Sequence, residues 1–411
     1  MNIPLAAGLM VLPLLHAFAG TPEIPRRNVV VICLDTLRAD RVGGKDSQTP
    51  ALDRFSQTAY AFEQAISASA WTLPSIMSVF TSRYPHEHRL TNEYETFLQN
   101  EKRRARLSPK IRTFSEIFKN AGYATAAFTG GAGVAGDFGF NRGFDVYVDD
   151  QRFATIADTG PPALRWIRKN KDRPFFLFLH GYDVHNRALN SGREEYESLR
   201  DKTIRGEEIA VSDREITRWK TRYDAAVRDA DRRLGDVLKQ IDAVEGFSEN
   251  TAVAVFSDHG EELFDHGGVD HGMKLYDEII RVPLILRLPG RPGRRIAEQV
   301  RLIDIAPTLL AWAQIYPDKE TQTQMRGVSL LPLLAGEKLS LDAYSESDYL
   351  LHSFQRSLRT HRGLKFLYDP LNETRLLFDV KNDPREKKDL LKTNPEEAAD
   401  LERRLLRRMT R

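Results

Sequence analysis

The sequence predicts an α/β protein with a large, mostly parallel sheet, helices on both faces of that sheet, and a small α+β subdomain at the C-terminus. Short apolar runs alternate along the chain with amphipathic, helix-like segments, which is typical of a parallel sheet covered by helices. The chain has 411 residues and is 41% hydrophobic, enough for one large core and a smaller appendage. We divide it into a signal peptide (1–19), a main domain (20–335) and a C-terminal α+β subdomain (336–411).

The chain begins with the apolar segment "MNIPLAAGLMVLPLLHAFAG", which is too short to span a bilayer comfortably. It contains Ala17-Phe18-Ala19, a small-x-small pattern typical of a cleavage site. We therefore expect an exported protein, periplasmic or extracellular, with no transmembrane segment in the mature chain. Because no Lys or Arg precedes the apolar run, an uncleaved anchor is the alternative.

The main domain alternates between the two kinds of element. Its strand candidates are short runs of β-branched or aromatic residues, and its helix candidates carry charged residues on one side. Strands are expected over 28–34, 124–129, 174–180, 251–257 and 282–288, and helices over 49–59, 113–122 and 213–243. After Pro332 the segment "HRGLKFLYDPLNETRLLFDVKNDPREKKDLL" predicts a meander of antiparallel strands followed by an amphipathic helix.

Two charged stretches, 92–112 and 191–215, interrupt this pattern, and we expect them at the surface as solvated loops or as lids over a site. The formal net charge is only +2, because 60 Lys and Arg nearly balance 58 Asp and Glu. This balance gives no support for nucleic-acid binding. Cys33 is the only cysteine, which excludes an internal disulfide, and its apolar strand predicts a buried packing residue.

Two distant stretches each lead from an apolar strand directly into side chains that bind metals. "VVVICLDTLRAD" places Asp35 after the first strand, and "TAVAVFSDHGEELFDHGG" places Asp258 and His259 after a later one. The carboxyl ends of parallel strands meet at one edge of a sheet, so these three residues are expected to converge there. Carboxylates and an imidazole on one divalent cation would supply a Lewis acid for an anionic ester.

Eight blocks of sequence resemble the sulfatase family within the alkaline-phosphatase superfamily, and the likeness covers nearly everything after the export segment. The Asp258-His259-Gly260-Glu261 block is the most specific. The blocks, in family order, are "LDTLRADRV", "TPALDRFSQTAYAFEQAISASAWTLPSIMSVFTSRYPHEH", "TFSEIFKNAGYATAAFTGG", "GFNRGFDVY", "FFLFLHGYDVH", "VFSDHGEELFDHGG", "LYDEIIRVPLIL" and "LIDIAPTLL".

The resemblance implies an alkaline-phosphatase-like fold with a catalytic main domain, and a role for each matching residue. Asp35, Asp258 and His259 would bind the metal. Thr72 in "WTLPS" occupies the place of the family's nucleophile, and His185 falls where a histidine contacts the ester or protonates the leaving group. The basic residue that holds the anionic group falls at His271 or Lys274.

Three positions depart from the family pattern. Thr72 stands where most members convert Cys or Ser to formylglycine, Ile76 replaces the signature arginine, and Thr36 replaces the second aspartate of a pair. A sulfated threonine would turn over poorly, whereas a phosphorylated one can be attacked in line beside a metal, so phosphoester chemistry is favoured. A site with one carboxylate fewer and an imidazole favours zinc or manganese, with calcium possible.

We therefore expect a metal-dependent hydrolase or transferase for sulfate or phosphate esters. Its partner would be a small anionic ester, a sulfated or phosphorylated glycan, or a lipid head group, with no nucleic acid. A catalytically inactive relative with a binding or structural role is the alternative, as is a true sulfatase that uses an unmodified threonine.

Several residues also have plain structural interpretations. Asp35 can cap a helix, Thr72 can be a structural hydroxyl at a helix start, and His185 can be an ordinary satisfied histidine. The remaining histidines are expected to brace turns or line the pocket: His86 and His88, His266, and His180 with Asp183 beside it.

Overall fold

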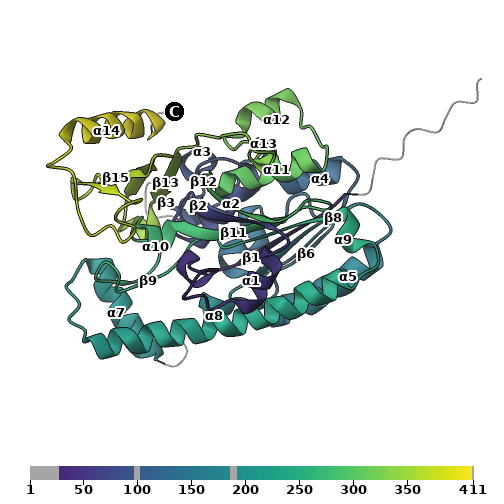
Figure 1. Cartoon of the computed structure of the whole chain (residues 1–411), viewed down its shortest axis with the longest axis horizontal. Helices are drawn as coiled ribbons and strands as arrows, with labels where there is room; N and C mark the ends of the chain where they lie inside the picture. Colours follow the sequence, from purple (N-terminus) through teal and green to yellow (C-terminus); the bar gives the residue numbers. More distant parts are fainter. Residues whose placement is uncertain (1–26, 97–101, 186–191, 410–411) are drawn as a thin grey trace, which may run out of the picture.

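The computed structural model describes residues 27–96, 102–185 and 192–409, so the predicted signal peptide lies outside the described residues. Figure 1 shows a central sheet covered by helices, with the C-terminal helix α14 set apart beside a smaller sheet. Within the described residues, no helix combines the length and apolar character needed to cross a bilayer.

The central sheet has eight strands among the described residues, in the order β12-β2-β11-β8-β1-β7-β5-β6. Strand β1 lies in the middle and pairs in parallel with both β7 and β8. Four of the expected strands are therefore confirmed as parallel neighbours or near neighbours. The bounds are β1 Asn28–Leu34, β2 Tyr60–Ile66, β5 Ala124–Phe128, β6 Val146–Val148, β7 Phe175–Gly181, β8 Thr251–Phe256, β11 Arg281–Arg287 and β12 Arg294–Arg301.

Strand β11 runs antiparallel to both of its neighbours, whereas alternation of strands and helices predicts a parallel strand there. A parallel neighbour needs a crossover that carries the chain back to the other edge of the sheet. Residues 257–280 make no such crossover, because they stay at the edge where β8 ends and are tied there by the Gly260 N–H, which donates to the Ile279 carbonyl at 2.6 Å. The chain therefore enters β11 at that edge and runs back.

Both faces of the sheet are buried, as the near-continuous apolar sequence of its strands requires. Alternate residues of β1 face different cores: Val31 and Cys33 lie in one, Ile32 and Leu34 in the other. Cys33 is thus the buried packing residue that was predicted. Helices α2 (Thr72–Thr81), α4 (Phe114–Asn120) and α11 (Ile305–Trp312) cover the first face, and α1 (Pro50–Ser56), α5 (Ile156–Asn170) and α8 (Asp213–Asp242) cover the second.

The C-terminal part forms the expected meander and helix. Strands β13 (Ala343–Ser347), β14 (Gln355–Arg359), β15 (Leu364–Asp369) and β16 (Thr374–Asp379) pair antiparallel in chain order. Leu401 and Leu405 of α14 (Pro395–Met409) pack on the apolar side of this sheet. The boundary near residue 336 stays a prediction.

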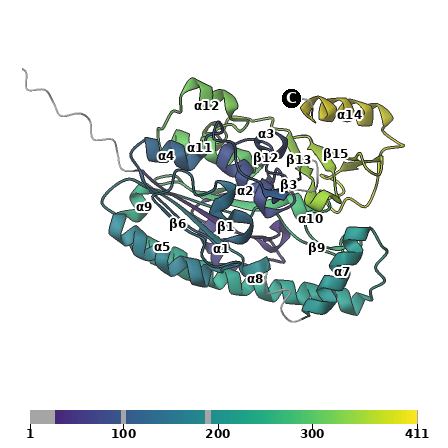
Figure 2. The same ribbon diagram turned by 180° about the vertical axis from the view of Figure 1, so that it is seen from behind.

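The two charged stretches form structure of their own. The first contributes the short strands β3 (Tyr94–Thr96) and β4 (Lys102–Arg104), and the second contributes helix α7 (Arg193–Arg205). Figures 1 and 2 show α7 beside the N-terminal part of α8, where both extend beyond the sheet. The other short elements are α3 Pro85–His88, α9 Phe247–Asn250, β9 Glu262–Leu263, β10 Val269–Asp270, α10 Asp277–Ile280, α12 Lys319–Gln324 and α13 Leu331–Leu334.

A buried ion pair network attaches the C-terminal sheet to the main domain. The Lys365 ammonium, on β15, lies 2.9 Å from a carboxylate oxygen of Asp277 and 2.8 Å from one of Glu386, and the lysine is fully buried. Replacing Lys365 by Met should lower the free energy of unfolding by about 3–5 kcal/mol, because the buried Glu386 loses its counter-charge and Asp277 is left with Arg359 at 3.2 Å. Denaturant titration measures this, with the exposed Lys381→Met as the control. A loss below about 1 kcal/mol would contradict the network's role.

Candidate active site

Side chains from two distant stretches meet at the carboxyl edge of the central sheet. Asp35 directly follows β1, and Asp258 and His259 follow β8. Each of these three residues offers one ligand atom, the three atoms lie within 4.8 Å of one another, and all three residues are fully buried. We refer to Asp35, Asp258 and His259 as the inner cluster. The geometry is the one that the sequence predicted, and the metal-binding role stays a prediction.

The orientation of His259 suits a ligand. Its Nδ1 lies 2.9 Å from the Gly260 carbonyl oxygen, so this nitrogen carries the hydrogen and Nε2 turns its lone pair toward the cluster. Nε2 lies 3.4 Å from Asp258 Oδ2 and 3.9 Å from Asp35 Oδ1. Burial and the nearby His271 lower the pKa of His259 to about 3, which keeps the imidazole neutral.

Only glycine fits at position 260, in the turn that follows β8 and leads from His259 to Glu261. A Cβ atom at Gly260 would lie 2.0 Å from the carbonyl oxygen of Glu278, a contact that no side chain tolerates. The close approach fixes the backbone between His259 and Glu261. It therefore determines where both of these side chains point.

The pKa values of the two carboxyl groups in the inner cluster, Asp35 and Asp258, are shifted in opposite directions. Burial raises the pKa of Asp35, but the imidazoles of His180, 3.6 Å away, and of His259 hold this pKa well below its usual value. Burial and the charge of Asp35 raise the pKa of Asp258 well above its usual value. Asp35 Oδ1 and Asp258 Oδ2 have no hydrogen-bond partner among the described residues. Two buried, unsatisfied carboxylate oxygens beside a neutral imidazole fit a divalent cation.

Thr72 joins the inner cluster from the other side. It is the first residue of α2, it is buried, and its hydroxyl donates to Asp35 Oδ2 at 3.0 Å. The Thr72 hydroxyl oxygen also lies 3.3 Å from His259 Nε2. A Cβ on Gly133 would lie 3.0 Å from Thr72 Cβ, so a glycine backbone packs directly against the threonine. The amino end of a ten-residue helix favours negative charge on the Thr72 oxygen.

The two other departures from the family pattern have defined places. Ile76 is fully buried in α2 and belongs to the apolar core. Thr36 has φ 61°, a left-handed conformation that is rare for a β-branched residue and costs about 1–3 kcal/mol. This turn directs the Thr36 N–H toward Asp258 Oδ1, 3.4 Å away. Thr36 therefore contacts the inner cluster through its backbone.

A cavity of about 830 Å³ opens in front of the inner cluster, within the range usual for small-molecule sites. Thr72, His185 and His271 all line it. The His185 ring stacks on Phe153 at 5.5 Å and lies 5.1 Å from the His271 ring. Both charged stretches contribute to its walls, which agrees with the lid interpretation. They contribute Asn92, Glu93 and Tyr94 from the first and Arg193, Tyr196, Glu197 and Arg200 from the second.

The structure separates the two candidate basic residues. His271 lies in the cavity, with its ring 4.4 Å from that of His259. Lys274 points elsewhere: its ammonium donates to Glu262 at 2.9 Å and to the His266 carbonyl at 2.8 Å. Among the described residues that line the cavity, Lys274 is absent. The geometry therefore favours His271 over Lys274 for contact with an anionic group.

The remaining histidines mostly hold the structure around the site. His180, at the end of β7, is buried with Nε2 3.6 Å from Asp35 Oδ2. His86 pairs with Glu346 at 2.8 Å and His266 with Glu278 at 2.6 Å. Asp183 accepts the Ile156 N–H at 2.7 Å, so it caps the start of α5, and its orienting role toward His185 stays a prediction.

Two residues that support the cavity, Arg200 and Tyr182, were not among the site residues predicted from the sequence. Arg200, on α7, donates to Asp270 at 2.5 Å and to the Tyr349 hydroxyl at 3.0 Å, and so joins a charged stretch to the C-terminal part. The Tyr182 hydroxyl accepts the Gly133 N–H at 3.0 Å. Tyr182 had a signal, since it lies within "HGYDVH", but Arg200 sits in a stretch whose charge resembles any solvated surface.

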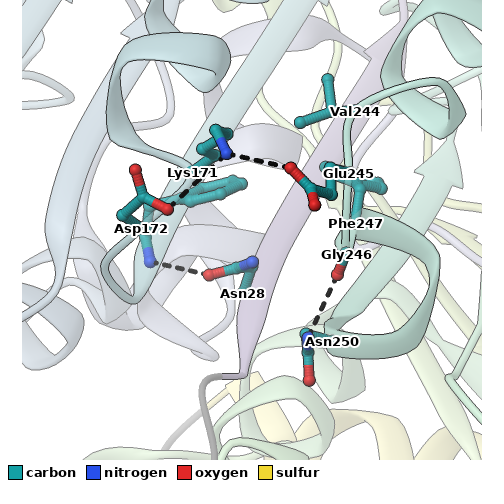
Figure 3. A pocket seen from close by; sticks show the side chains of 9 residues that line it. Asn28, Lys171, Asp172, Val244, Glu245, Gly246, Phe247 and Asn250 are labelled. Atoms are coloured by element: carbon teal, nitrogen blue, oxygen red, sulfur yellow. Dashed lines mark hydrogen bonds and ion pairs between the residues drawn. The ribbon is translucent and has the colours of Figure 1, made fainter.

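A second cavity of about 380 Å³ lies at the opposite edge of the sheet (Figure 3). Asn28 begins β1 there, and Lys171 pairs with Asp172 and Glu245 across the opening. Asp35 lies seven positions after Asn28 along β1, a distance of about 20 Å. Its charged side chains are exposed and paired with one another, so it has none of the features of the inner cluster.

The sequence matches a family model described as "Sulfatase" over residues 27–315. The chain belongs to the sulfatase family. A model described as "N-sulphoglucosamine sulphohydrolase, C-terminal" matches residues 265–411 of this sulfatase-family chain. Family membership and its relatives support ester hydrolysis as the general activity.

Three relatives are similar along most of their length. The N-acetylglucosamine-6-O-sulfatase of Bacteroides thetaiotaomicron is 22% identical over 89% of this chain and 82% of its own. The phosphonate monoester hydrolase of Agrobacterium radiobacter superposes with a TM-score of 0.72 at 18% identity, over 93% of this chain and 95% of its own. The structure of BT4656 in complex with its substrate D-glucosamine-2-N,6-O-disulfate superposes with a TM-score of 0.73 at 19% identity. The superposition covers 94% of this chain and 97% of the BT4656 chain. These structures share the fold.

His88 supports the helix that carries Thr72, and it should make the stability of the fold sensitive to acid. Its Nδ1 accepts the Leu90 N–H at 3.1 Å, and Nε2 lies 3.1 Å from the Ser78 hydroxyl. Burial lowers the pKa of His88 to about 3, below the value of about 6.5 in an unfolded chain. Between these values the unfolded state binds the extra proton, so stability is lost as the pH falls below about 6.5.

The expected slope from His88 is up to about 1.4 kcal/mol per pH unit between pH 6.5 and 3. Urea unfolding of the chelated protein at several pH values measures it. In His88→Gln, the free energy of unfolding should fall less steeply below about pH 6.5 than it does in the unchanged protein. Parallel curves for the two proteins would contradict a buried, neutral His88.

Proposed function

We propose that this protein is a metal-dependent ester hydrolase, or a transferase, whose nucleophile is the unmodified hydroxyl of Thr72 and whose preferred substrates are phosphate esters. The observation that carries the proposal is the position of the Thr72 hydroxyl. It lies at a helix N-terminus, within 3.0 Å of Asp35 and 3.3 Å of His259, and faces an 830 Å³ cavity.

The residues of the site divide the chemistry among them. A divalent cation held by Asp35, Asp258 and His259 would supply Lewis-acid charge that lowers the pKa of the hydroxyl and polarises an ester oxygen. The hydrogen bond from Thr72 to Asp35 orients the attacking oxygen. His185, on the cavity wall, is placed to protonate the departing alcohol, and His271 to contact the anionic group.

The threonine decides between phosphate and sulfate. A threonine cannot form the aldehyde hydrate through which formylglycine expels sulfate, so a sulfated Thr72 would have to be attacked directly. Phosphothreonine is less of a trap, because water or an acceptor alcohol can attack phosphorus in line beside a metal. Water as the attacking group gives hydrolysis, and an alcohol gives transfer.

The cavity supports a substrate larger than a simple aryl ester. Aromatic walls from Trp71, Phe153 and Tyr349 alternate with charged groups such as Arg152 and Glu197. Aromatic faces and hydrogen-bonding side chains together suit a sugar ring. Two of the relatives described above act on or bind sulfated glucosamine, so a glycan ester is the substrate that we favour over a lipid head group. The export that the N-terminal segment predicts would agree with such a substrate.

A catalytically inactive protein is the second candidate. Ile76 and Thr36 are the observations that favour it, because neither can supply the arginine or the carboxylate expected at its place. The unsatisfied carboxylate oxygens of the inner cluster favour the enzyme, since a scaffold gains nothing by burying them.

Replacing Thr72 by Ala should lower kcat/KM by about 1,000-fold or more, because it removes the nucleophile. Chromogenic phosphate mono- and diesters, phosphonates and sulfate esters provide the assay. Thr72→Ser keeps a hydroxyl and should retain activity within about tenfold. Ser75→Ala is the matched control, since its buried hydroxyl bonds the Asp258 carbonyl one turn further along α2. Full activity of the alanine variant would exclude Thr72 as the nucleophile.

Removal of the metal should abolish turnover without unfolding the chain. After chelation and dialysis, activity should return with zinc or manganese more fully than with calcium, because imidazole is among the ligands. Asp258→Asn should prevent this recovery and reduce the metal content of the purified protein. Equal activity before and after chelation, with no metal bound, would contradict metal dependence.

A further inference from the structure

A second group of ligand side chains lies beside the inner cluster. Glu261, Asp270 and His271 each offer one ligand atom, and these atoms lie within 4.8 Å of one another. We refer to these three residues as the outer cluster. Their exposed fractions are 7%, 6% and 7%, so all three are removed from bulk solvent. Asp270 and His271 nevertheless border the cavity that holds Thr72.

The outer cluster is incompletely satisfied by protein groups. His271 Nδ1 lies 2.9 Å from Asp270 Oδ1 and 3.4 Å from Glu261 Oε2, so one nitrogen faces two carboxylate oxygens. The other oxygen of Glu261, Oε1, has no hydrogen-bond partner among the described residues. An unpartnered carboxylate oxygen on a side chain more than nine-tenths buried carries a desolvation cost that a bound cation would remove.

Rigid neighbours hold the outer cluster in place. Arg200 donates to Asp270 Oδ2 at 2.5 Å and leaves Oδ1 directed at His271. Asp270 itself has φ 79°, a strained left-handed conformation fixed by the pairing of β9 with β10. Glu261 follows Gly260, whose backbone is confined by the Glu278 carbonyl. Preformed ligand positions of this kind lower the cost of binding an ion.

The two clusters are neighbours. The His259 and His271 ring centroids are 4.4 Å apart, so one histidine of each cluster contacts the other. Two adjacent pairs of carboxylates would repel an anionic ester unless cations neutralise them. One divalent ion at the inner cluster does not neutralise Glu261 and Asp270, whose positive neighbours are then Arg200, beside Asp270, and the hydrogen on His271 Nδ1.

We propose that Glu261, Asp270 and His271 bind a second divalent cation. Two carboxylate oxygens and one imidazole nitrogen are a donor set suited to zinc or manganese. On binding, the cation replaces the hydrogen that His271 Nδ1 holds between the two carboxylates, and that proton is released to solvent. The second ion lies on the cavity side of the first, so the anionic group of a substrate would meet both.

The same geometry allows a simpler occupant: a proton on His271 Nδ1, with no ion at all. Metal stoichiometry separates the two, because it requires neither a known substrate nor turnover. The test is inductively coupled plasma mass spectrometry of the full chain after dialysis against zinc or manganese and removal of free ion. The expected result is two equivalents per chain.

Variants assign each equivalent to its cluster. Glu261→Gln and, independently, Asp270→Asn should each reduce the content from two equivalents to one. Asp258→Asn, in the inner cluster, should also leave one. Glu262→Gln is the matched control, since Glu262 is a buried acid next in sequence that pairs with Lys274, and it should retain two. Circular dichroism identifies any variant that fails to fold, and the other outer-cluster variant then carries the test.

The outcomes distinguish this proposal from the proposed function. One equivalent that is lost in Asp258→Asn and kept in Glu261→Gln and Asp270→Asn overturns the outer site and leaves the metal-dependent hydrolase intact. Two equivalents that persist in both outer-cluster variants also overturn it, because the second ion then lies elsewhere. A chain that binds no ion overturns both proposals. If one equivalent of metal binds and is lost only in Glu261→Gln and Asp270→Asn, the outer site is supported and the inner cluster is excluded as a metal site.

Discussion

Two carboxyl groups buried side by side, Asp35 and Asp258, are the constraint on which the rest of the site depends. The parallel pairing of β1 with β8 brings them level, because Cys33 lies opposite Phe256 and each aspartate comes two residues further along. Neither group can reach water, and like charges so close cannot both ionise without help. The opposite pKa directions of the two aspartates express this conflict. A cation resolves it, and the surrounding groups are arranged accordingly: His259 turns a lone pair inward, and Thr72 donates its hydrogen to Asp35.

Much of this arrangement could be predicted from residues alone. The strands that carry Asp35 and Asp258 are continuous apolar runs, which are typical of a sheet buried on both faces, and the ends of such strands share one edge. The C-terminal meander and helix also followed from local pattern. Helix α8 begins at a capping box made by Ser212 and Glu215, a signal that the sequence shows openly.

Other features depend on tertiary contacts that no local pattern encodes. The direction of β11 follows from the Gly260–Ile279 hydrogen bond, which holds its entry at the site edge. Helix α5 contains Pro161 and Pro162, residues that normally interrupt a helix, and it persists because its apolar side packs on β5 and β7. The choice between His271 and Lys274 rests on Glu262, which captures the lysine. Spacing in sequence could not decide it.

The proposed chemistry of the site requires a cation between Asp35, Asp258 and His259. Anomalous scattering from crystals grown with manganese or zinc locates that ion directly. A peak within coordination distance of Asp35 Oδ1, Asp258 Oδ2 and His259 Nε2, close to the Thr72 hydroxyl, is the result that this account predicts. A well-ordered map with no peak there, and the two carboxyl groups bonded to each other through a shared proton, would contradict it.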